Sequence, residues 1–467
     1  MRRTKIICTI GPNTQDYKSL LRLAELGMNV VRLNMSHGDH IWHSQVIKAI
    51  KSINSKGKYS LSILMDTKGP EVRTGDLKHQ LILKKGDIFN FTISRQAKYQ
   101  QNTVEVNYDG FIDDIKIDDI ILIDGGMISF RVKNKTKNDA VCECLDGGTL
   151  TSRRHLNIRG KSARLPTITK KDWEDIKFGI KEGFDFIALS FVKNRATIEE
   201  VKTYLKKQKA PIDVIAKIES AQSIPYIDEI IESSDGVMVA RGDLGAELPI
   251  EEVPLIQEEI VSQCLASGKP VIVATHLLES MIENPTPTRA EVTDIFLAVR
   301  QKADAIMLSG ETAVGLYPYK AVSVMSTVAE RIEKRVFEDK EINIAVTSDP
   351  KTEVARSASI LANNLNSAAI LVFTRRGYMG TLVSKCRPNS SIYAFTNMTS
   401  VRRRLNLYWG VASFRVKFSN NPEHTIQRAV EVLKNKHLFK KNDQVVIVSD
   451  ILAGKEYVET VQIRRIN

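Results

Sequence analysis

Two carboxylates in the sequence are placed to bind a divalent cation. Glu219 and Asp243 each follow a short apolar segment with the composition of a buried strand. Carboxylate oxygens are hard ligands, and two of them on an ion that keeps water and substrate oxygens elsewhere is the pattern expected for Mg²⁺ or Mn²⁺. Neither histidine nor cysteine joins the pair, which argues against zinc. Lys217 and Arg32 follow similar segments and would neutralise the charge that develops on a moving phosphoryl group.

A second group of oxygen donors would suit a monovalent cation. Asn34, Ser36, Asp66 and Thr67 carry one formal charge among them, which fits a monovalent ion better than a second Mg²⁺. The alternative is that the stretch from Asn34 to Gly38 is an ordinary strand-to-helix turn with Asn34 or Ser36 as the N-cap.

Short apolar runs precede these polar residues and recur along the chain. Their centres lie near Ile6, Val30, Ile63, Phe186, Val214, Val237, Val271 and Ile306. All but one interval suits one strand and one amphipathic helix. Eight parallel strands alternating with helices predict an α/β fold with a closed (β/α)₈ barrel, or TIM barrel, because that number closes the sheet and buries each strand on both faces. A doubly wound open sheet is the alternative.

The carboxyl ends of the strands of such a barrel form one pocket. The polar residues that would meet there are Arg32, Asn34, Ser36, Asp66, Thr67, Ser190, Lys217, Glu219, Arg241, Asp243, Thr275, Ser309 and Glu311. A lone Lys-Ile-Glu is more often a half-exposed strand than a catalytic pair, and His276 reads as a packed or capping histidine. The shared location of the set favours a site.

Two further domains are predicted. The long interval between the third and fourth runs contains alternating segments such as Val104 to Tyr108 and Ile128 to Val132, which predict a small β-barrel or sandwich inserted over residues 70–166. The barrel then comprises residues 1–69 and 167–337, and Thr169 to Asp172 form a capping-box pattern that opens its next helix. Five more strand-like runs with helical segments between most of them predict a C-terminal α/β domain over residues 338–467.

Seven ordered motifs resemble those of the pyruvate kinases, over essentially the full length of the chain. They are Thr4 to Pro12, Arg32 to Gly38, Asp66 to Gly75, Lys217-Ile218-Glu219, Met238 to Gly245, Pro287 to Glu291 and Met307 to Thr312. The resemblance implies transfer of the phosphoryl group of phosphoenolpyruvate to ADP, which gives pyruvate and ATP. It also implies that the inserted domain is a lid, that the C-terminal domain serves regulation and oligomerisation, and that the protein is a homotetramer.

The resemblance further implies a role for each matching residue. Arg32 would contact the transferring phosphoryl group, and Lys217 would stabilise it in the transition state. Gly242, Asp243, Thr275 and Ser190 would contact the substrate, and Glu219 and Asp243 would bind Mg²⁺. Asn34, Ser36, Asp66 and Thr67 would bind K⁺. Arg73 and Arg154 would bind the phosphates of the nucleotide. Because an aliphatic alcohol is a very weak acid, we expect Thr275 to orient a water or a relay that includes Ser309 and Glu311 when the enolate is protonated.

Three departures from the family pattern point to one branch of it. Arg154 stands where the family often has lysine, Ser220 replaces an asparagine, and His276 replaces a glutamine or asparagine. Arg154 keeps the positive charge, although arginine and lysine differ in reach and geometry. These residues are similar to the plastid and cyanobacterial branch. The start of the chain leads directly into a strand-like run, which predicts a cytoplasmic protein; a plastid is the alternative if a transit peptide has been removed.

Two loops of the sequence bear on regulation. The resemblance implies that Glu71 lies beside the predicted monovalent-ion site, where members of the family that work without K⁺ tend to carry lysine, so we expect K⁺ activation. The loop from Thr374 to Gly380 has one aliphatic hydroxyl, and Ile451 to Glu456 lacks the proline and glycine of the family's second effector loop. We therefore expect insensitivity to fructose 1,6-bisphosphate and activation by a sugar monophosphate through Arg375 and Arg376.

Composition limits the other classes of function. The 467 residues carry 67 lysines and arginines against 55 acidic residues, which favours anionic partners. Nucleic acid is not expected, because aromatic residues make up 6% of the chain and show no interleaved basic pattern. We interpret Arg402 to Arg404 and Lys434 to Lys441 as solvated helix faces. Apolar runs are too short to span a membrane. A Mg²⁺-dependent lyase acting on a 2-oxo acid is the remaining enzyme alternative.

Overall fold

A closed parallel barrel forms the centre of the molecule. The computed structural model describes residues 2–95, 102–160, 165–336, 349–453 and 456–466. The strands lie in the order β1-β16-β15-β14-β13-β12-β3-β2, and their bounds are β1 Lys5–Thr9, β2 Val30–Asn34, β3 Ser62–Asp66, β12 Phe186–Leu189, β13 Asp213–Ile218, β14 Gly236–Ala240, β15 Val271–Ala274 and β16 Ala305–Leu308. Each predicted run is one of these strands. The alternative of an open sheet is wrong.

Helices follow the barrel strands and cover the outside of the sheet. They are α1 Tyr17–Leu26, α2 His40–Ser55, α4 Lys170–Glu182, α5 Arg195–Lys207, α6 Ile227–Ser233, α7 Arg241–Glu247, α8 Glu252–Ser267, α9 Arg289–Arg300, α10 Gly310–Ala313 and α11 Pro318–Val336, with 3₁₀ helices η1 Ala221–Tyr226 and η2 Glu279–Ile282. The predicted capping box at Thr169 is confirmed, because its side chain and that of Asp172 each accept the other's backbone N–H. Gly27, with φ 117°, ends α1 in the left-handed conformation that glycine permits.

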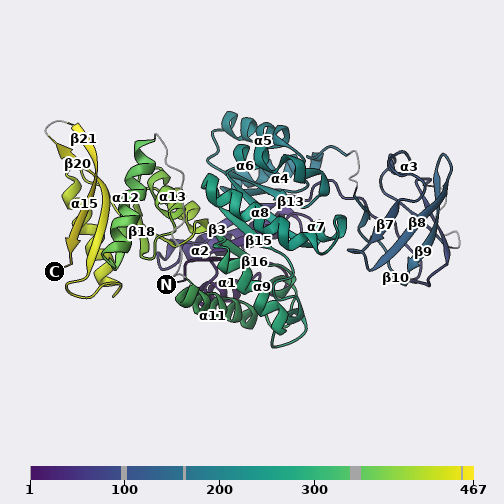
Figure 1. Cartoon of the computed structure of the whole chain (residues 1–467), viewed down its shortest axis with the longest axis horizontal. Helices are drawn as coiled ribbons and strands as arrows, with labels where there is room; N and C mark the ends of the chain where they lie inside the picture. Colours follow the sequence, from purple (N-terminus) through teal and green to yellow (C-terminus); the bar gives the residue numbers. More distant parts are fainter. Residues whose placement is uncertain (1, 96–101, 161–164, 337–348, 454–455, 467) are drawn as a thin grey trace.

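An all-β unit lies between β3 and α4, as predicted (Figure 1). A six-stranded sheet runs in the order β11-β7-β8-β9-β5-β6, and β10 pairs with β4 beside it. The bounds are β4 Leu81–Leu83, β5 Ile88–Thr92, β6 Thr103–Glu105, α3 Phe111–Asp114, β7 Ile120–Ile123, β8 Ile128–Lys135, β9 Asp139–Asp146, β10 Gly148–Leu150 and β11 Leu156–Ile158. The rings of Phe89, Phe91 and Phe130 pack against one another in edge-to-face and tilted contacts, with centroids 5.1–5.4 Å apart. They belong to a hydrophobic core that this unit forms by itself.

The C-terminal part is a separate α/β unit on the opposite side of the barrel from the all-β unit (Figure 1). Its sheet has the order β19-β18-β17-β20-β21, with only β20 and β21 antiparallel. The bounds are α12 Pro350–Asn364, β17 Ala369–Phe373, α13 Tyr378–Lys385, β18 Ser391–Thr396, α14 Thr399–Arg404, η3 Leu405–Leu407, β19 Val411–Arg415, α15 Pro422–Asn435, β20 Gln444–Ala453 and β21 Glu456–Arg465. The predicted boundary at residues 337 and 338 lies outside the described residues.

Ion pairs that are buried or partly buried attach this C-terminal unit to the amino-terminal end of the barrel. Arg403 donates from Nε to both carboxylate oxygens of Asp185, at 2.9 and 3.0 Å, and Arg404 pairs with Asp213 at 3.0 Å. Arg387 pairs with the buried carboxylate of Asp304. The interpretation of Arg402 to Arg404 as a solvated helix face is therefore wrong, because Arg403 and Arg404 bind carboxylates that lie just before β12 and in β13 of the barrel.

No helix within the described ranges is long and apolar enough to cross a membrane.

Candidate active site

A single buried carboxylate organises the positive charges at the carboxyl ends of the strands. Asp66 is the last residue of β3 and is 1% exposed. Its Oδ2 accepts a hydrogen bond from Arg32 Nε at 2.7 Å, and its Oδ1 accepts one from Lys217 Nζ at 2.9 Å. Burial raises the pKa of Asp66, but the charges of Arg32 and Lys217 outweigh burial and lower it overall. The carboxylate is therefore ionised and holds both cations in place.

Lys217 has acceptors on every side of its ammonium group. It donates to Ser190 Oγ at 2.7 Å and lies 3.2 Å from Glu219 Oε2, in addition to its bond to Asp66. Burial lowers the pKa of Lys217, but the carboxylates of Asp66 and Glu219 more than offset burial, so the pKa is raised. A lysine held in its charged form can stabilise negative charge but is a poor general base.

Glu219 is the residue that best fits a divalent cation. Its Oε1 accepts a hydrogen bond from Phe191 N at 2.6 Å, whereas its buried Oε2 accepts no hydrogen bond and is only ion-paired, with Lys217 Nζ at 3.2 Å. Burial raises the pKa of Glu219, Lys217 lowers it, and the carboxylates of Asp243 and Asp66 raise it further, with a net upward shift. A buried carboxylate oxygen has lone-pair positions beyond the one that faces Lys217. A cation shared with Asp243, which lies in the first turn of α7, would bind that oxygen and relieve the repulsion between the carboxylates.

The predicted monovalent-ion donors lie around the same end of β2 and β3. Asn34 pairs in register with Asp66, and Asn34 Oδ1 accepts the N–H of Ser36 at 3.0 Å. Thr67 Oγ1 accepts the N–H of Ser190 at 3.0 Å. The N-cap of α2 is Asp39, whose side chain accepts the N–H of Trp42, so the alternative that Asn34 or Ser36 caps this helix is wrong.

Thr275 and Gly242 meet across the ends of β15 and β14. Gly242 N donates to Thr275 Oγ1 at 2.8 Å, and Thr275 Oγ1 donates to Ala274 O at 2.7 Å. Thr275 has φ 66° and His276 has φ 55°. Left-handed backbone is strained for any residue other than glycine, and such strain gathers at functional sites. His276 is exposed rather than packed, so the interpretation of it as a packed histidine is wrong.

Ser309 and Glu311 lie together after β16. Glu311 is 1% exposed, and its two carboxylate oxygens accept the N–H groups of Leu278 at 3.2 Å and Ser309 at 2.7 Å. Burial raises the pKa of Glu311. Ser309 Oγ is buried and has no hydrogen-bond partner among the described atoms. Glu311 thus orders the loops after β15 and β16, and the relay role of the two residues stays a prediction.

The two arginines predicted to bind nucleotide phosphates lie at the joint between barrel and lid. Arg73 Nε pairs with Glu71 Oε2 at 2.8 Å, and Arg73 Nη1 donates to Arg153 O at 2.9 Å. Arg154 pairs with Asp124 at 2.9 Å and donates to Thr151 Oγ1. Both guanidinium groups are partly exposed and already partnered by acids, so a nucleotide phosphate would have to compete with Glu71 and Asp124.

A cavity of about 520 Å³ beside Arg32 was not predicted from the sequence. Pro12, His37, Trp42 and Val314 are among its lining residues. Trp42 is half-buried and donates from Nε1 to Gln15 Oε1. The signal in the sequence was a tryptophan soon after the Asn34 to Gly38 turn. A flat aromatic wall next to a cationic centre suits the base of a nucleotide.

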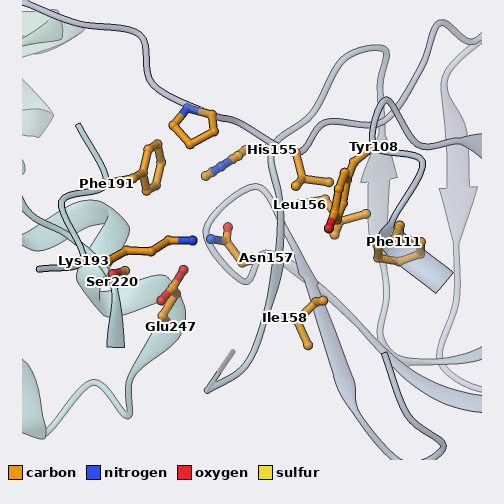
Figure 2. A pocket seen from close by; sticks show the side chains of 12 residues that line it. Tyr108, Phe111, His155, Leu156, Asn157, Ile158, Phe191, Lys193, Ser220 and Glu247 are labelled. Atoms are coloured by element: carbon orange, nitrogen blue, oxygen red, sulfur yellow. The ribbon is translucent and has the colours of Figure 1, made fainter. Parts of the chain in front are cut away.

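A smaller cavity of about 40 Å³ separates the lid from the barrel. Figure 2 shows Asn157 of the lid and Lys193 of the barrel pointing toward each other across it, with Ser220 and Glu247 beside Lys193. Asn157 Oδ1 and Ser220 Oγ are buried without hydrogen-bond partners in the described part of the chain. A cavity of this size has room for a water molecule, and these two unpartnered atoms could bind one.

Comparisons with known proteins agree with this arrangement. The family model for the pyruvate kinase barrel domain matches residues 1–322, and the model for the pyruvate kinase alpha/beta domain matches residues 352–464. Isozyme G of chloroplastic pyruvate kinase from Nicotiana tabacum is 53% identical over 96% of this chain and 80% of its own length. Plastidial pyruvate kinase 2 from Arabidopsis thaliana is 49% identical over 100% of this chain and 81% of its own length.

A solved structure gives the same result. A crystal structure of a pyruvate kinase from Cryptosporidium parvum superposes with a TM-score of 0.92 at 34% identity, and covers 100% of this chain and 96% of that one. With matching family models, relatives at about half identity and a matching solved structure, the chain belongs to the pyruvate kinase family of enzymes.

Proposed function

We propose that this chain transfers the phosphoryl group of phosphoenolpyruvate to ADP, which gives pyruvate and ATP. The observation that carries the proposal is the buried cluster in which Asp66 holds Arg32 and Lys217 beside the two carboxylates Glu219 and Asp243. Phosphoryl transfer is mostly a matter of position and charge neutralisation, and this cluster supplies fixed positive charge in a water-poor site.

Each residue of the cluster has a separate task in the proposed reaction. When bound, Mg²⁺ or Mn²⁺ supplies charge neutralisation at the phosphoryl oxygens, and K⁺ does so at lower charge density. Arg32 binds the phosphoryl group of the substrate, and Lys217 contacts it as it leaves for the nucleotide. Ser190 and Asp66 orient Lys217 through hydrogen bonds of 2.7 and 2.9 Å, so the ammonium group need not reorganise during transfer.

The second half of the reaction is protonation of the enolate left after transfer. Gly242 N and Thr275 Oγ1 form a pair of groups that could hold the carboxylate of the substrate. Because a threonine hydroxyl is a weak acid, Thr275 orients a water rather than acting as the final proton source. Ser309 Oγ, which is buried without a partner among the described atoms, is a candidate member of that relay.

The nucleotide would lie between the barrel and the lid. The cavity lined by Pro12 and Trp42 is large enough for a nucleoside, and Arg73 and Arg154 lie on the lid side. Binding of the phosphates would draw these arginines from Glu71 and Asp124, and so would link nucleotide binding to closure of the lid.

The oligomer and the compartment are further parts of the proposal. We infer a homotetramer, as in the family. The plastidial and chloroplastic names of several relatives support the plastid over the cytoplasm. Light scattering of the purified protein tests the first inference, and imaging of the tagged full-length protein in its own cells tests the second.

A coupled assay tests the reaction. Purified chain is incubated with phosphoenolpyruvate and Mg²⁺, with or without ADP and with or without K⁺, while pyruvate and ATP are both measured. The proposal expects equal amounts of pyruvate and ATP, only with ADP present and fastest with K⁺. Pyruvate formed without ADP would instead indicate hydrolysis by a phosphatase, and the absence of ATP under every condition would refute the proposal.

A further inference from the structure

Arg241 bridges two strand ends by its side chain. Its backbone begins α7 after β14, and its guanidinium reaches to the end of β15. Nε donates to Ala274 O at 3.2 Å, and Nη2 donates to Thr275 O at 2.5 Å. The side chain is 11% exposed. Arg241 therefore binds two consecutive carbonyl oxygens just where the backbone becomes left-handed.

The third nitrogen of the Arg241 guanidinium, Nη1, is bound by side chains of two helices. Nη1 pairs with Asp294 Oδ1 of α9 at 2.5 Å and donates to Gln257 Oε1 of α8 at 3.3 Å. Gln257 in turn donates to Gln301 at 2.7 Å. All three nitrogens of Arg241 are thus engaged, and its planar group can take only one orientation.

The turn that Arg241 binds is strained and carries the hydroxyl of Thr275. Thr275 and His276 both have positive φ, and such conformations are strained for residues other than glycine. The turn packs tightly on Gly242, since a Cβ at that glycine would lie 3.2 Å from His276 Cε1 and 3.4 Å from Thr275 Oγ1. Without a restraint from another side chain, relaxation of the two left-handed residues would lower the free energy of the backbone. The Thr275 hydroxyl would then move away from Gly242 N.

We propose that Arg241 is a positioning residue that holds the strained Thr275–His276 turn and so places the Thr275 hydroxyl for the protonation step. The inference rests on the proposed function, because it assigns Thr275 to that reaction. Arg241 touches no reacting atom in this account and acts only through the backbone of β15. The forked guanidinium of Arg241 is required to bind both carbonyl oxygens of the turn. Lysine has a single side-chain nitrogen and cannot span the two oxygens in the same way.

The test combines a conservative substitution with relief of the strain. Arg241→Lys keeps the charge opposite Asp294 but loses the fork. His276→Gly removes the conformational cost at one of the two strained positions, because glycine adopts positive φ freely. We expect R241K to lower kcat, and exchange of the methyl hydrogens of pyruvate with solvent deuterium, by about 10- to 100-fold. We expect H276G alone to stay near the wild-type values and the double variant to recover at least about a third of the lost rate.

Controls separate this role from general stability and from the reaction itself. Arg464→Lys alters a comparable double hydrogen bond, to Glu423 in the C-terminal unit, and should leave both rates unchanged. Crystal structures of R241K and the double variant report φ at residues 275 and 276 without reference to activity. Wild-type rates and unchanged φ in folded R241K would overturn the inference, as would a loss that H276G does not rescue. An inactive wild-type enzyme would refute the proposed function, while the φ values would still decide the role of Arg241.

Discussion

Lys217 Nζ donates to Asp66 Oδ1 at 2.9 Å, although the two residues lie on strands that are not neighbours in the barrel. Strand β12 lies between β13 and β3, and Ser190, which directly follows β12, accepts a hydrogen bond from the same ammonium group. The bond therefore crosses the mouth of the barrel. It keeps Lys217 charged, and the same carboxylate binds Arg32 through its other oxygen.

Lys217→Met should lower kcat by about 10³-fold or more and change the apparent affinity for phosphoenolpyruvate much less. The reason is that the ammonium group acts mainly on charge that develops in the transition state. Steady-state kinetics with varied phosphoenolpyruvate measure both quantities. Lys5→Met is the matched control, because Lys5 is also buried but donates to Val411 O at the other end of the barrel. That variant should lose stability without loss of kcat, and normal turnover in folded K217M would remove Lys217 from the reaction.

Activation by K⁺ should depend on Glu71. Burial raises the pKa of Glu71, but its hydrogen bond to Arg73 and the charge of Arg73 lower it overall, so the carboxylate is ionised. We expect strong activation by K⁺ in the wild type and a smaller ratio of rates with and without K⁺ in Glu71→Lys, where an ammonium group replaces the ion. Glu71→Gln, which adds no positive charge, should not work without K⁺. Full wild-type activity in K⁺-free tetramethylammonium buffer would contradict this prediction.

Fructose 1,6-bisphosphate should not activate the enzyme. The loop between β17 and α13 contains one aliphatic hydroxyl, Thr374 Oγ1, and it already accepts the N–H of Gly377 at 3.0 Å. Arg375 lies over the ring of Phe418 at 5.6 Å, and Arg376 is exposed. Two guanidinium groups can still capture a single phosphate. Part of the second predicted loop, at residues 454 and 455, lies outside the described residues.

Titration of both sugars at subsaturating phosphoenolpyruvate tests that prediction. A sugar monophosphate should raise the rate, and the double variant Arg375→Ala with Arg376→Ala should abolish the effect without change in the basal rate. Activation by the bisphosphate alone would show that this interpretation of the loop is wrong.

The Arg403–Asp185 pair should make the stability of the enzyme depend on pH. Burial raises the pKa of Asp185 despite the charge of Arg403. A carboxyl whose folded pKa lies above its unfolded value stabilises the fold most at low pH, and that contribution is lost as pH rises through the folded pKa. Arg403→Ala raises this pKa further. We therefore expect a loss of about 3 kcal/mol at pH 8 and a clearly smaller loss at pH 5.

Thermal unfolding midpoints of wild type and Arg403→Ala at pH 5 and pH 8 measure this difference. Lys51→Ala, which breaks the surface pair with Glu182, should shift the midpoint little at either pH. An equal shift at both pH values for Arg403→Ala would mean that Asp185 does not titrate with folding.

The sequence by itself determined the eight barrel strands, the all-β insertion and the C-terminal α/β sheet. Parallel strands that are buried on both faces have continuous apolar sequences, which can be recognised without a structure. Helix caps such as Thr169 with Asp172 are local patterns of a few residues. Because the carboxyl ends of barrel strands must converge, the order of residues along the chain also suffices to group the polar residues at those ends into one site.

Only the tertiary structure decided how those residues are paired. Contacts between distant segments make Asp66 the shared partner of Arg32 and Lys217. Such contacts also make Arg403 and Arg404 anchors rather than a solvated face. The support that Arg241 gives to the Thr275 turn depends on a contact of the same kind. The cavity beside Trp42 is likewise shaped by separate loops. Side-chain pairing across such distances is set by the packing of whole elements, which neither local propensity nor hydrophobic periodicity encodes.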